Sequence, residues 1–420
     1  MTAPARSNPW VVLGTLLVIY IFNFADRYLL TGLIGPIKQE FDLGDGMIGL
    51  LMGPAFVVLY IAMGVPFARL ADRGSRVRVI AGGCVMWSLA TAATGLATGP
   101  VSLALARVGV GVGEAAFVAP AYSLLADYFR PERRGIAFGI LGLATYVGQI
   151  AGQAGGPAIA AELGWRSAFF AIGLPGVALG GLALLLVREP PREGGAAQAA
   201  EPPIALTRLA GLLARSRSFV LMAIGFGLGA LSGVAFGYWG PELFARSFAL
   251  DPVTIKTAFA VNFGLAGLAG MLCFGALSDR LARRGPAWPV RLSALAIGAA
   301  TAMVMLAVWA PSFEAAMWIA IPCGLLGGGW TVGIFATLQY LLPPGFRASA
   351  TALFIAFTTL LGYFIGPWAA GAISQSLGDD GQSLRLALSV VVPVGFAAAL
   401  AAFLAARRVE QDRQTLEQAG

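Results

Sequence analysis

The chain has 420 residues, of which 58% are hydrophobic and 12% are charged, and its formal net charge is +7. Soluble domains carry about 25% charged residues, so this composition excludes a soluble protein and predicts an integral membrane protein. The basic balance is then a sign of membrane orientation and gives no reason to expect a nucleic-acid partner. The three cysteines stand singly in apolar stretches and the chain has no histidine, so we expect no disulfide, metal site or cofactor.

Twelve apolar stretches are long enough to cross a membrane, which takes about 20 residues in a helix. We expect the spans at 10–34, 46–68, 79–106, 101–126, 135–161, 167–187, 218–241, 257–278, 292–313, 315–346, 348–378 and 386–406. The stretch 79–106 is broken by Gly99-Pro100, a turn signal that separates the third span from the fourth. The predicted fold class is an all-α membrane protein with twelve transmembrane helices.

Arginine and lysine gather in alternate loops between these spans. Arg69, Arg73, Arg76 and Arg78 follow the second span, and similar clusters follow the fourth, sixth, eighth and twelfth. Such clusters mark cytoplasmic loops. We therefore expect both termini and the polar segment 188–217 to be cytoplasmic. The Ala- and Arg-rich composition, with only two lysines, suggests the inner membrane of a bacterium.

Four ionisable residues interrupt the first and fourth spans: Asp26, Arg27, Arg107 and Glu114. A charge at a helix centre in the bilayer costs roughly 2.5–3.5 kcal/mol even on lenient scales, so such residues usually pair and face a bundle interior or a wet cavity. Helical rise puts Asp26 about 24 Å and Glu114 about 20 Å from the cytoplasmic end of its helix. These depths match within about one helical turn, which is compatible with an Arg27–Glu114 pair. Arg107 is seven residues before Glu114 and shares its helix face, so Asp26–Arg107 is a second candidate pair.

The two pairs have a functional and a structural interpretation. They bind substrate and protons, or they are permanently ionised and only hold the first and fourth helices together. In the functional interpretation Glu114 is the proton-responsive group, because the guanidinium of Arg27 stays charged at physiological pH. Asp26 is the competing candidate, since it is equally deep.

The segment 188–217 divides the twelve spans into six and six. Its Pro, Gly and Ala content is typical of a linker, with a short surface helix near 204–214. We expect an N-terminal six-helix bundle at 1–187, a C-terminal bundle at 218–406 and a cytoplasmic tail at 407–420.

Two pieces of sequence recur at nearly constant offset in the two halves. "ARLADRGSRVR" (68–78) corresponds to "GALSDRLARR" (275–284), and "GQAGGP" (152–157) corresponds to "GYFIGP" (362–367). A repeat of this size in a twelve-helix chain is typical of a transporter built from two related halves.

The repeated loops resemble the signature of the major facilitator superfamily: a Gly, three residues, Asp, a basic residue, any residue, Gly, then basic residues. Ala68 replaces the first Gly in the first copy, and Ala282 stands at the second Gly position in the second. "GWRSAFF" (164–170) is also similar to this superfamily. The resemblance implies two pseudo-symmetric six-helix bundles around a central cavity, in a monomer. It also implies a cytoplasmic conformational lock formed by the loop charges Asp72, Arg73, Arg76, Asp127, Asp279, Arg280, Arg283 and Arg284.

The glycine–proline pairs of the fifth and eleventh helices have two interpretations. They are hinges between the two halves, or they only allow close helix packing, which is common in membrane helices. The candidate hinge residues are Gly152, Gly156, Pro157, Gly362, Gly366 and Pro367.

A finer resemblance is to the spinster branch of the superfamily. It runs through "NFADRYLLTG" (23–32), "ARVGVGVGEAAFVAPAYSLLADYFRPERRG" (106–135) and "FGYWGPELF" (236–244). The resemblance implies a lysolipid-like or sphingoid-phosphate-like substrate. Polar and aromatic candidates to line the cavity are Asn23, Tyr122, Tyr146, Gln149, Tyr238, Trp330, Phe335 and Gln339.

The function expected from these features is proton-linked secondary active transport of an amphipathic lipid-like substrate by alternating access. The partners expected are the substrate, protons and membrane lipids. Efflux of drugs or organic anions by an antiporter is the alternative. A membrane-embedded lipid enzyme is disfavoured, because there is no histidine and no clustered Ser or Asp motif.

Overall fold

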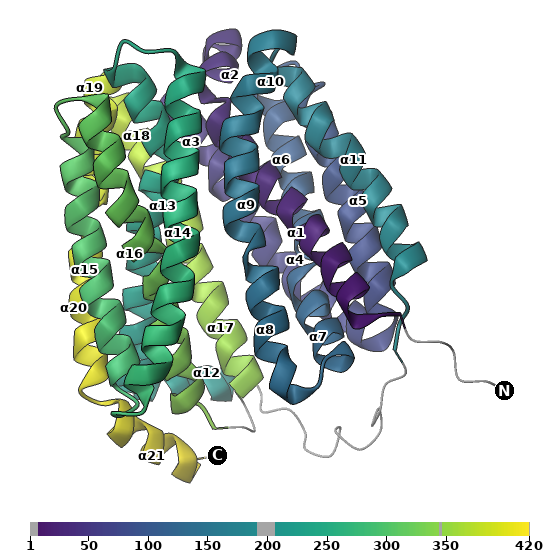
Figure 1. Cartoon of the computed structure of the whole chain (residues 1–420), viewed down its shortest axis with the longest axis vertical. Helices are drawn as coiled ribbons and strands as arrows, with labels where there is room; N and C mark the ends of the chain where they lie inside the picture. Colours follow the sequence, from purple (N-terminus) through teal and green to yellow (C-terminus); the bar gives the residue numbers. More distant parts are fainter. Residues whose placement is uncertain (1–6, 191–205, 344–346, 420) are drawn as a thin grey trace. The chain divides into compact units, whose positions relative to one another are not determined.

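The computed structural model describes residues 7–190, 206–343 and 347–419, and over these ranges it contains helices and no strand. Twelve helical segments of the described chain are long and apolar enough to cross a membrane, which confirms the predicted fold class. The chain divides into two compact units, drawn in sequence colours in Figure 1. The first unit comprises Met1–Gly195 and Asp251–Ala260, and the second comprises Ala196–Leu250 and Val261–Gly420.

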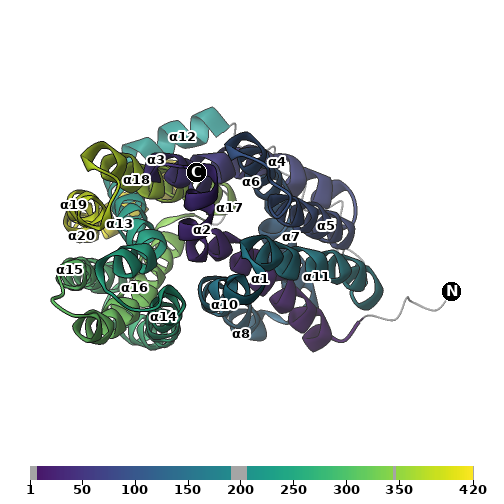
Figure 2. The same cartoon turned by 90° about the horizontal axis from the view of Figure 1, so that it is seen from above.

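The first unit carries the elements of six spans. They are α1 (Pro9–Gly32), α2 (Ile34–Phe41), α3 (Asp45–Met52), α4 (Pro54–Arg73), α5 (Arg76–Thr94), α6 (Pro100–Glu114), α7 (Val118–Tyr128), α8 (Pro131–Gly142), α9 (Ala144–Ile150), η1 (Ala151–Gly155), α10 (Gly156–Leu163) and α11 (Trp165–Leu186). Within this unit α1 lies beside α9, η1 and α11 (Figures 1 and 2).

The second unit carries the remaining elements. They are α12 (Leu206–Arg215), α13 (Arg217–Ser247), α14 (Pro252–Ala282), α15 (Trp288–Val308), α16 (Phe313–Leu341), α17 (Arg347–Thr359), η2 (Leu360–Ile365), α18 (Gly366–Leu377), α19 (Gly381–Val391), α20 (Val394–Ala406) and α21 (Val409–Ala419). The first residues of α14 belong to the first unit. Half of the polar segment 188–217, namely residues 191–205, lies outside the described residues. Its last part forms α12, close to the expected surface helix.

The third and fourth spans meet near the turn signal read from the sequence. The third span ends at Thr94, and Gly99 caps the helix that starts at Pro100. Proline suits this first helical position because it lacks an N–H that would have no partner there. The fourth span is interrupted again, since α6 ends at Glu114 and α7 begins at Val118. The sequence stretch 79–106 therefore contains the end of one helix and the start of the next. Glu114 is the last residue of α6, so it lies at a break inside the fourth span.

Both repeated glycine–proline pairs follow a π-helical segment. η1 precedes Gly156-Pro157, and η2 precedes Gly366-Pro367. A proline inside a helix removes one N–H donor and its ring crowds the carbonyl four residues earlier. A wider π turn is a common local adjustment, and it is frequent at functional sites. The two halves thus share a local backbone feature as well as a sequence repeat.

The glycines of these segments allow close packing against a neighbouring helix. A Cβ on Gly152 would lie 2.4 Å from the carbonyl oxygen of Ala25 on α1. In the second unit, a Cβ on Gly366 would lie 2.7 Å from the carbonyl oxygen of Leu231 on α13. Helices in lipid associate through such close backbone contacts, so the packing interpretation accounts for these glycines. Hinging remains a prediction.

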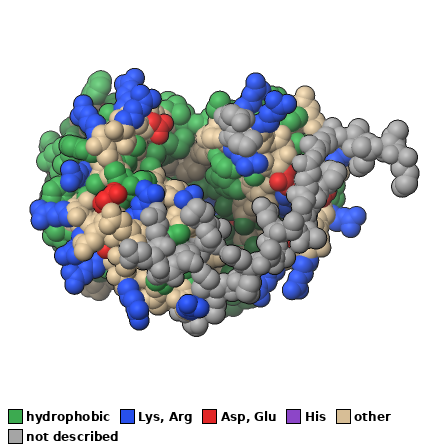
Figure 3. All heavy atoms as spheres, turned by 90° about the horizontal axis from the view of Figure 1, so that it is seen from below, with side chains coloured by type: hydrophobic (Ala, Val, Ile, Leu, Met, Phe, Trp, Pro, Cys, Tyr) green, Lys and Arg blue, Asp and Glu red, His purple; other side chains and the backbone are tan. Residues whose placement is uncertain are grey.

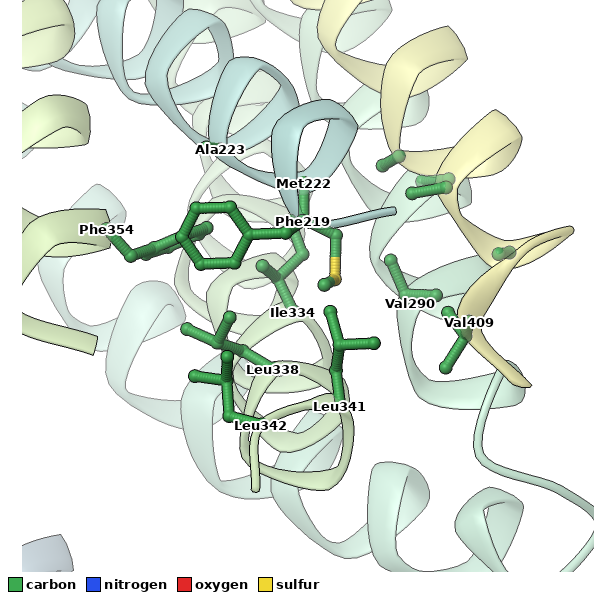
Figure 4. Close-up of a cluster of buried hydrophobic side chains, with 14 of the residues drawn as sticks. Phe219, Met222, Ala223, Val290, Ile334, Leu338, Leu341, Leu342, Phe354 and Val409 are labelled. Carbon is green, nitrogen blue, oxygen red and sulfur yellow. The ribbon is translucent and has the colours of Figure 1, made fainter. Parts of the chain in front are cut away.

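The second unit has a large apolar core, part of which is shown in Figure 4. Phe219 and Met222 of α13 pack there with Ile334 and Leu338 of α16. The C-terminal residues, expected only as a tail, form α21 and contribute Val409 to the same core.

Candidate functional site

The predicted pair of Arg27 and Glu114 is formed in the first unit. Nε of Arg27 donates to Oε2 of Glu114 over 2.6 Å, although the residues are 87 positions apart. Glu114 is fully buried and Arg27 is 9% exposed. The helix break after Glu114 is close to this contact, because α6 ends at that residue. A short charged hydrogen bond in a buried setting is among the stronger polar contacts available to a protein.

The second predicted pair is also formed. A terminal nitrogen of Arg107 lies 3.3 Å from Oδ2 of Asp26, and both side chains are almost completely buried. Asp26 and Arg27 are neighbours in α1, so their side chains leave the helix about 100° apart. This angle explains why they bind different partners on α6. Two pairs of oppositely charged side chains therefore link α1 to α6, which belong to two membrane spans.

Aromatic rings surround the Arg27 guanidinium. Its central carbon lies 4.7 Å from the ring centroid of Phe56, 5.0 Å from that of Tyr60 and 5.2 Å from that of Phe24. Phe56 and Tyr60 stack on each other, one turn apart on α4. Ring faces attract cations, most strongly where water is excluded. Phe56 and Tyr60 were not predicted, since an aromatic pair spaced four residues apart is ordinary in an apolar helix.

Several buried polar atoms near the pairs have no hydrogen-bond partner among the described residues. They include Oε1 of Glu114, Nε of Arg107 and both polar side-chain atoms of Asn23. Asn23 lies one turn before Arg27 on α1 and is 1% exposed. Buried polar groups without partners are uncommon and often mark a place for water, an ion or a ligand. Glu114 thus uses one oxygen in the ion pair, while its second oxygen has no hydrogen-bond partner among the described residues.

A chain of neutral polar side chains lies elsewhere in the first unit. Gln149 donates to Gln153 over 3.2 Å, and Gln153 donates to Thr31 over 3.1 Å. All three side chains are buried. Gln149 was predicted to line the cavity, but Gln153 and Thr31 were not. The spacing of two amides four residues apart, in a helix with few polar residues, could have indicated them.

The remaining predicted cavity residues have varied surroundings. Tyr122 packs against Phe138, and Tyr146 is half-buried on α9. In the second unit Tyr238 is buried near Tyr363, while Trp330 and Phe335 pack with Phe226 at the apolar core. Gln339 is exposed and donates to Thr351.

The loop charges fall into two groups. Arg76 is buried and binds Asp127 at 2.5 Å and Glu189 at 2.7 Å, and Glu189 also accepts from the backbone N–H of Val77. Glu189 was missed because it lies among polar residues after α11. The other predicted lock residues are exposed in the described structure: Asp72, Arg73, Asp279, Arg280, Arg283 and Arg284. Figure 3 shows many Lys and Arg side chains on the face seen from below.

The family model described as Major Facilitator Superfamily matches residues 16–360 and 243–420 of the chain. The MFS-type efflux pump of Mycolicibacterium smegmatis is 31% identical over 410 residues, covering 96% of this chain and 94% of that protein. Protein spinster homolog 1 of Bos taurus is 30% identical, covering 99% of this chain and 84% of that protein. The Sphingosine-1-phosphate transporter SPNS2 of Danio rerio is 28% identical, covering 89% and 77%.

Solved structures agree on the fold. A crystal structure of a bacterial homologue of the human lysosomal transporter spinster matches with a TM-score of 0.85 and 24% identity, covering 97% of this chain and 99% of that one. The charge pairs on α1 and α6 lie within the sequence segments that resemble the spinster branch. These findings make the chain a multi-pass membrane protein that belongs to the major facilitator superfamily of transporters and is of the spinster type.

Proposed function

We propose that the chain is a proton-linked secondary active transporter of an amphipathic anion, such as a lysolipid or a sphingoid phosphate. The observation that carries this proposal is the buried Arg27–Glu114 pair enclosed by aromatic rings. A cation among ring faces suits an anionic head group that carries an apolar chain. A sugar would need a denser set of hydrogen-bonding groups than this surrounding offers.

The proton would act by competing with Arg27 for Glu114. Protonation removes the negative charge of Glu114 and weakens its hold on the guanidinium, which is then free for the anionic head group. Loss of the proton lets the ion pair form again and displaces the substrate. Arg27 keeps its charge throughout, because guanidinium is not deprotonated in proteins. Asp26 is the alternative proton acceptor, since its partner Arg107 gives it the same chemistry.

The wider mechanism is alternating access of two related halves, the usual mechanism for transporters with internal repeats. The exposed loop charges Asp72, Arg73 and Asp279 would pair in one state and separate in the other, and so bias the equilibrium. Arg76 binds Asp127 and Glu189 within the first unit, which suits a fixed brace better than a contact between halves. We place both termini in the cytoplasm of a bacterium, from the loop arginines.

The substrate class has two candidates. The name of the zebrafish relative supports a lipid phosphate, and the name of the mycobacterial relative supports efflux of other compounds. The aromatic surroundings of Arg27 favour an anion with an apolar chain over a cationic drug. A membrane-embedded enzyme is the least favoured alternative, because the relatives reported above carry the names of transporters or of spinster proteins.

The test is transport by proteoliposomes under an imposed pH gradient. We expect uptake of a lysolipid or sphingoid phosphate by the wild type that responds to the gradient, and none by Arg27→Ala. Glu114→Gln should lose the pH response, whereas Asp26→Asn should keep it. Loss of the response in Asp26→Asn alone would move the proton site to Asp26. Saturable transport of a cationic drug, with no response to the lipids, would contradict the proposed substrate class.

A further inference from the structure

A groove with an apolar lining lies at the start of α13, where α12 and α17 meet it. Its volume is about 310 Å³, and its described lining residues are all apolar. Leu213 comes from α12, Phe219 and Ile224 from α13, and Phe354 and Phe357 from α17. The volume is at the low end of the range for ligand sites, roughly 300–1,000 Å³.

One side of the groove is open and the other is the core of the second unit. Phe219 and Phe354, which are labelled in Figure 4, are buried and pack on each other with ring centroids 5.9 Å apart. Phe357 is 46% exposed and belongs to the candidate span Ser349–Leu377. Since Phe357 lies in a membrane-spanning helix, the open side of the groove lies at a depth where lipid chains are available occupants.

Arginines stand at one end of the groove. Arg217 is the first residue of α13, is exposed, and shares a helix face with the lining residues Val220 and Ile224, three and seven positions later. Arg347 is the first residue of α17, seven positions before the lining residue Phe354, and its Nε donates to the Leu342 carbonyl oxygen. Helical rise puts the lining residues of α13 about 3–10 Å beyond Arg217. Positive charge next to a chain-sized apolar groove matches a lipid with an anionic head group.

The N-terminus of α13 is not itself free for an anion. Oδ2 of Asp412, on α21, accepts from the backbone N–H of Ser218 at 2.6 Å and from its hydroxyl at 2.8 Å. A phosphate at this end of the groove would therefore depend on arginine side chains rather than on helix N–H groups. Substitution of an arginine should then remove the head-group preference and leave the apolar groove intact.

We propose that this groove binds one acyl chain of an anionic bilayer phospholipid, with its phosphate on Arg217. The lipid is a bound component of the second unit and distinct from a transported substrate, since every described lining residue of the groove belongs to the second unit, whereas the charge pairs belong to the first. The amphipathic α12 forms one wall, with Leu209 and Leu213 buried and Arg208 and Arg215 exposed, as in helices that lie at a membrane interface. The lipid would join α12 to α13 and α17.

Native mass spectrometry of the purified protein tests this inference. The probes are dioleoyl phosphatidylglycerol and dioleoyl phosphatidylethanolamine, which share their chains and differ in charge. We expect the wild type to retain the first lipid preferentially. Arg217→Ala should lower that preference about fivefold, the change expected for one basic residue at a lipid surface. Arg407→Ala, an exposed arginine on the same unit that does not line the groove, should not lower it.

A second pair of variants tests the groove itself. Ala214→Phe fills the groove and should abolish retention of either lipid, whereas Ala397→Phe, at an exposed alanine of α20, should leave it unchanged. Equal retention by wild type and Ala214→Phe would overturn the site, as would an unchanged head-group preference in Arg217→Ala. If Ala214→Phe does not fold, Ala210→Phe fills the same groove from the preceding turn of α12. Transport by these variants is measured separately, so a failure here leaves the proposed function intact.

Discussion

The two units of this transporter have different interiors. The first unit buries two ion pairs and a chain of amides among its spans, together with Asn23, whose side chain has no hydrogen-bond partner among the described residues. The second unit buries a core of Phe, Trp, Leu and Ile side chains. In this core the ring of Phe226 packs against both Trp330 and Phe354. Buried charge is costly in a membrane and persists where it has a role, whereas an apolar core gives shape and rigidity. The comparison suggests that chemistry and shape are divided between the halves.

The division is not complete, because the second unit also contains a buried charge pair. Nε of Arg246 donates to Glu242 over 2.9 Å, and Glu242 is 5% exposed near the end of α13. The two residues of this pair lie one turn apart on the same helix, so the pair does not link two helices. The pairs of the first unit join α1 to α6, and they are therefore sensitive to any movement between those helices.

The largest effect is expected from Arg27→Ala. The substitution leaves Glu114 buried without its counter-charge, and removing one member of a buried pair typically costs about 3–5 kcal/mol. Thermal unfolding in detergent should show a large fall in Tm, and transport should stop. The double variant Arg27→Ala/Glu114→Ala should recover much of the Tm but no transport. A double variant as unstable as the single one would mean that the pair is not the main interaction of Arg27.

The next largest effect is expected where glycines pack on a neighbouring backbone. Gly152→Ala places a methyl group 2.4 Å from the Ala25 carbonyl oxygen, and overpacking typically costs about 1–3 kcal/mol. Gly155→Ala is the matched control in the same π-helical segment, because nothing lies within 4 Å of its Cβ position. Thermal unfolding should give a clearly lower Tm for Gly152→Ala than for Gly155→Ala. Similar Tm values would show that α1 and η1 can move apart at little cost.

A change in the second unit should affect binding and leave the proton response intact. Trp330→Leu removes a ring that packs on Phe226, and it should raise the KM for a lipid substrate. The dependence of transport on pH should stay as in wild type, because no ionisable group is changed. A shift in the pH dependence of transport in Trp330→Leu would contradict the division of roles between the units.

The loop brace of the first unit should have a moderate effect. Glu189→Gln weakens the ion pair with Arg76 and the contact with the N–H of Val77, and we expect a loss of about 1–2 kcal/mol, the scale of a hydrogen bond to a charged group. Asp127→Asn should have a similar effect, because both carboxylates bind Arg76. Thermal unfolding of the two single variants and the double variant would measure their coupling. Fully additive losses would contradict a shared brace.

The smallest effect concerns Glu40, outside the spans. Its hydrogen bonds with Arg166 and Trp165 hold the pKa of Glu40 below its usual value of 4.5. A lowered folded-state pKa means that the stabilisation is present above pH 4.5 and is lost as the pH falls through the folded-state value. Glu40→Gln should therefore lower Tm slightly at pH 7 and by less at pH 3. An equal difference from wild type at both values would rule out a contribution from the carboxylate charge.

The sequence by itself determined the membrane class, the number of spans and both charge pairs on α1 and α6. These conclusions were accessible because the apolar length needed to cross a bilayer is fixed, and because the depth of a residue follows from its position along a helix. The depth argument paired Arg27 with Glu114, and the shared helix face of Arg107 and Glu114 gave Asp26–Arg107 as the second candidate. The repeated glycine–proline pairs could be found from the sequence for a similar reason, since proline has a direct local effect on the helix.

Only the tertiary structure decided which uncharged residues surround those charges. The rotation of α4 brings Phe56 and Tyr60 to Arg27, and the packing of η1 on α1 brings Gln153 to Thr31. An apolar membrane helix has similar residues on every face, so its sequence does not show which face meets a neighbour. A charge has few acceptable partners in lipid, whereas an aromatic ring or an amide has many. That physical difference is why the pairs were predictable and their surroundings were not.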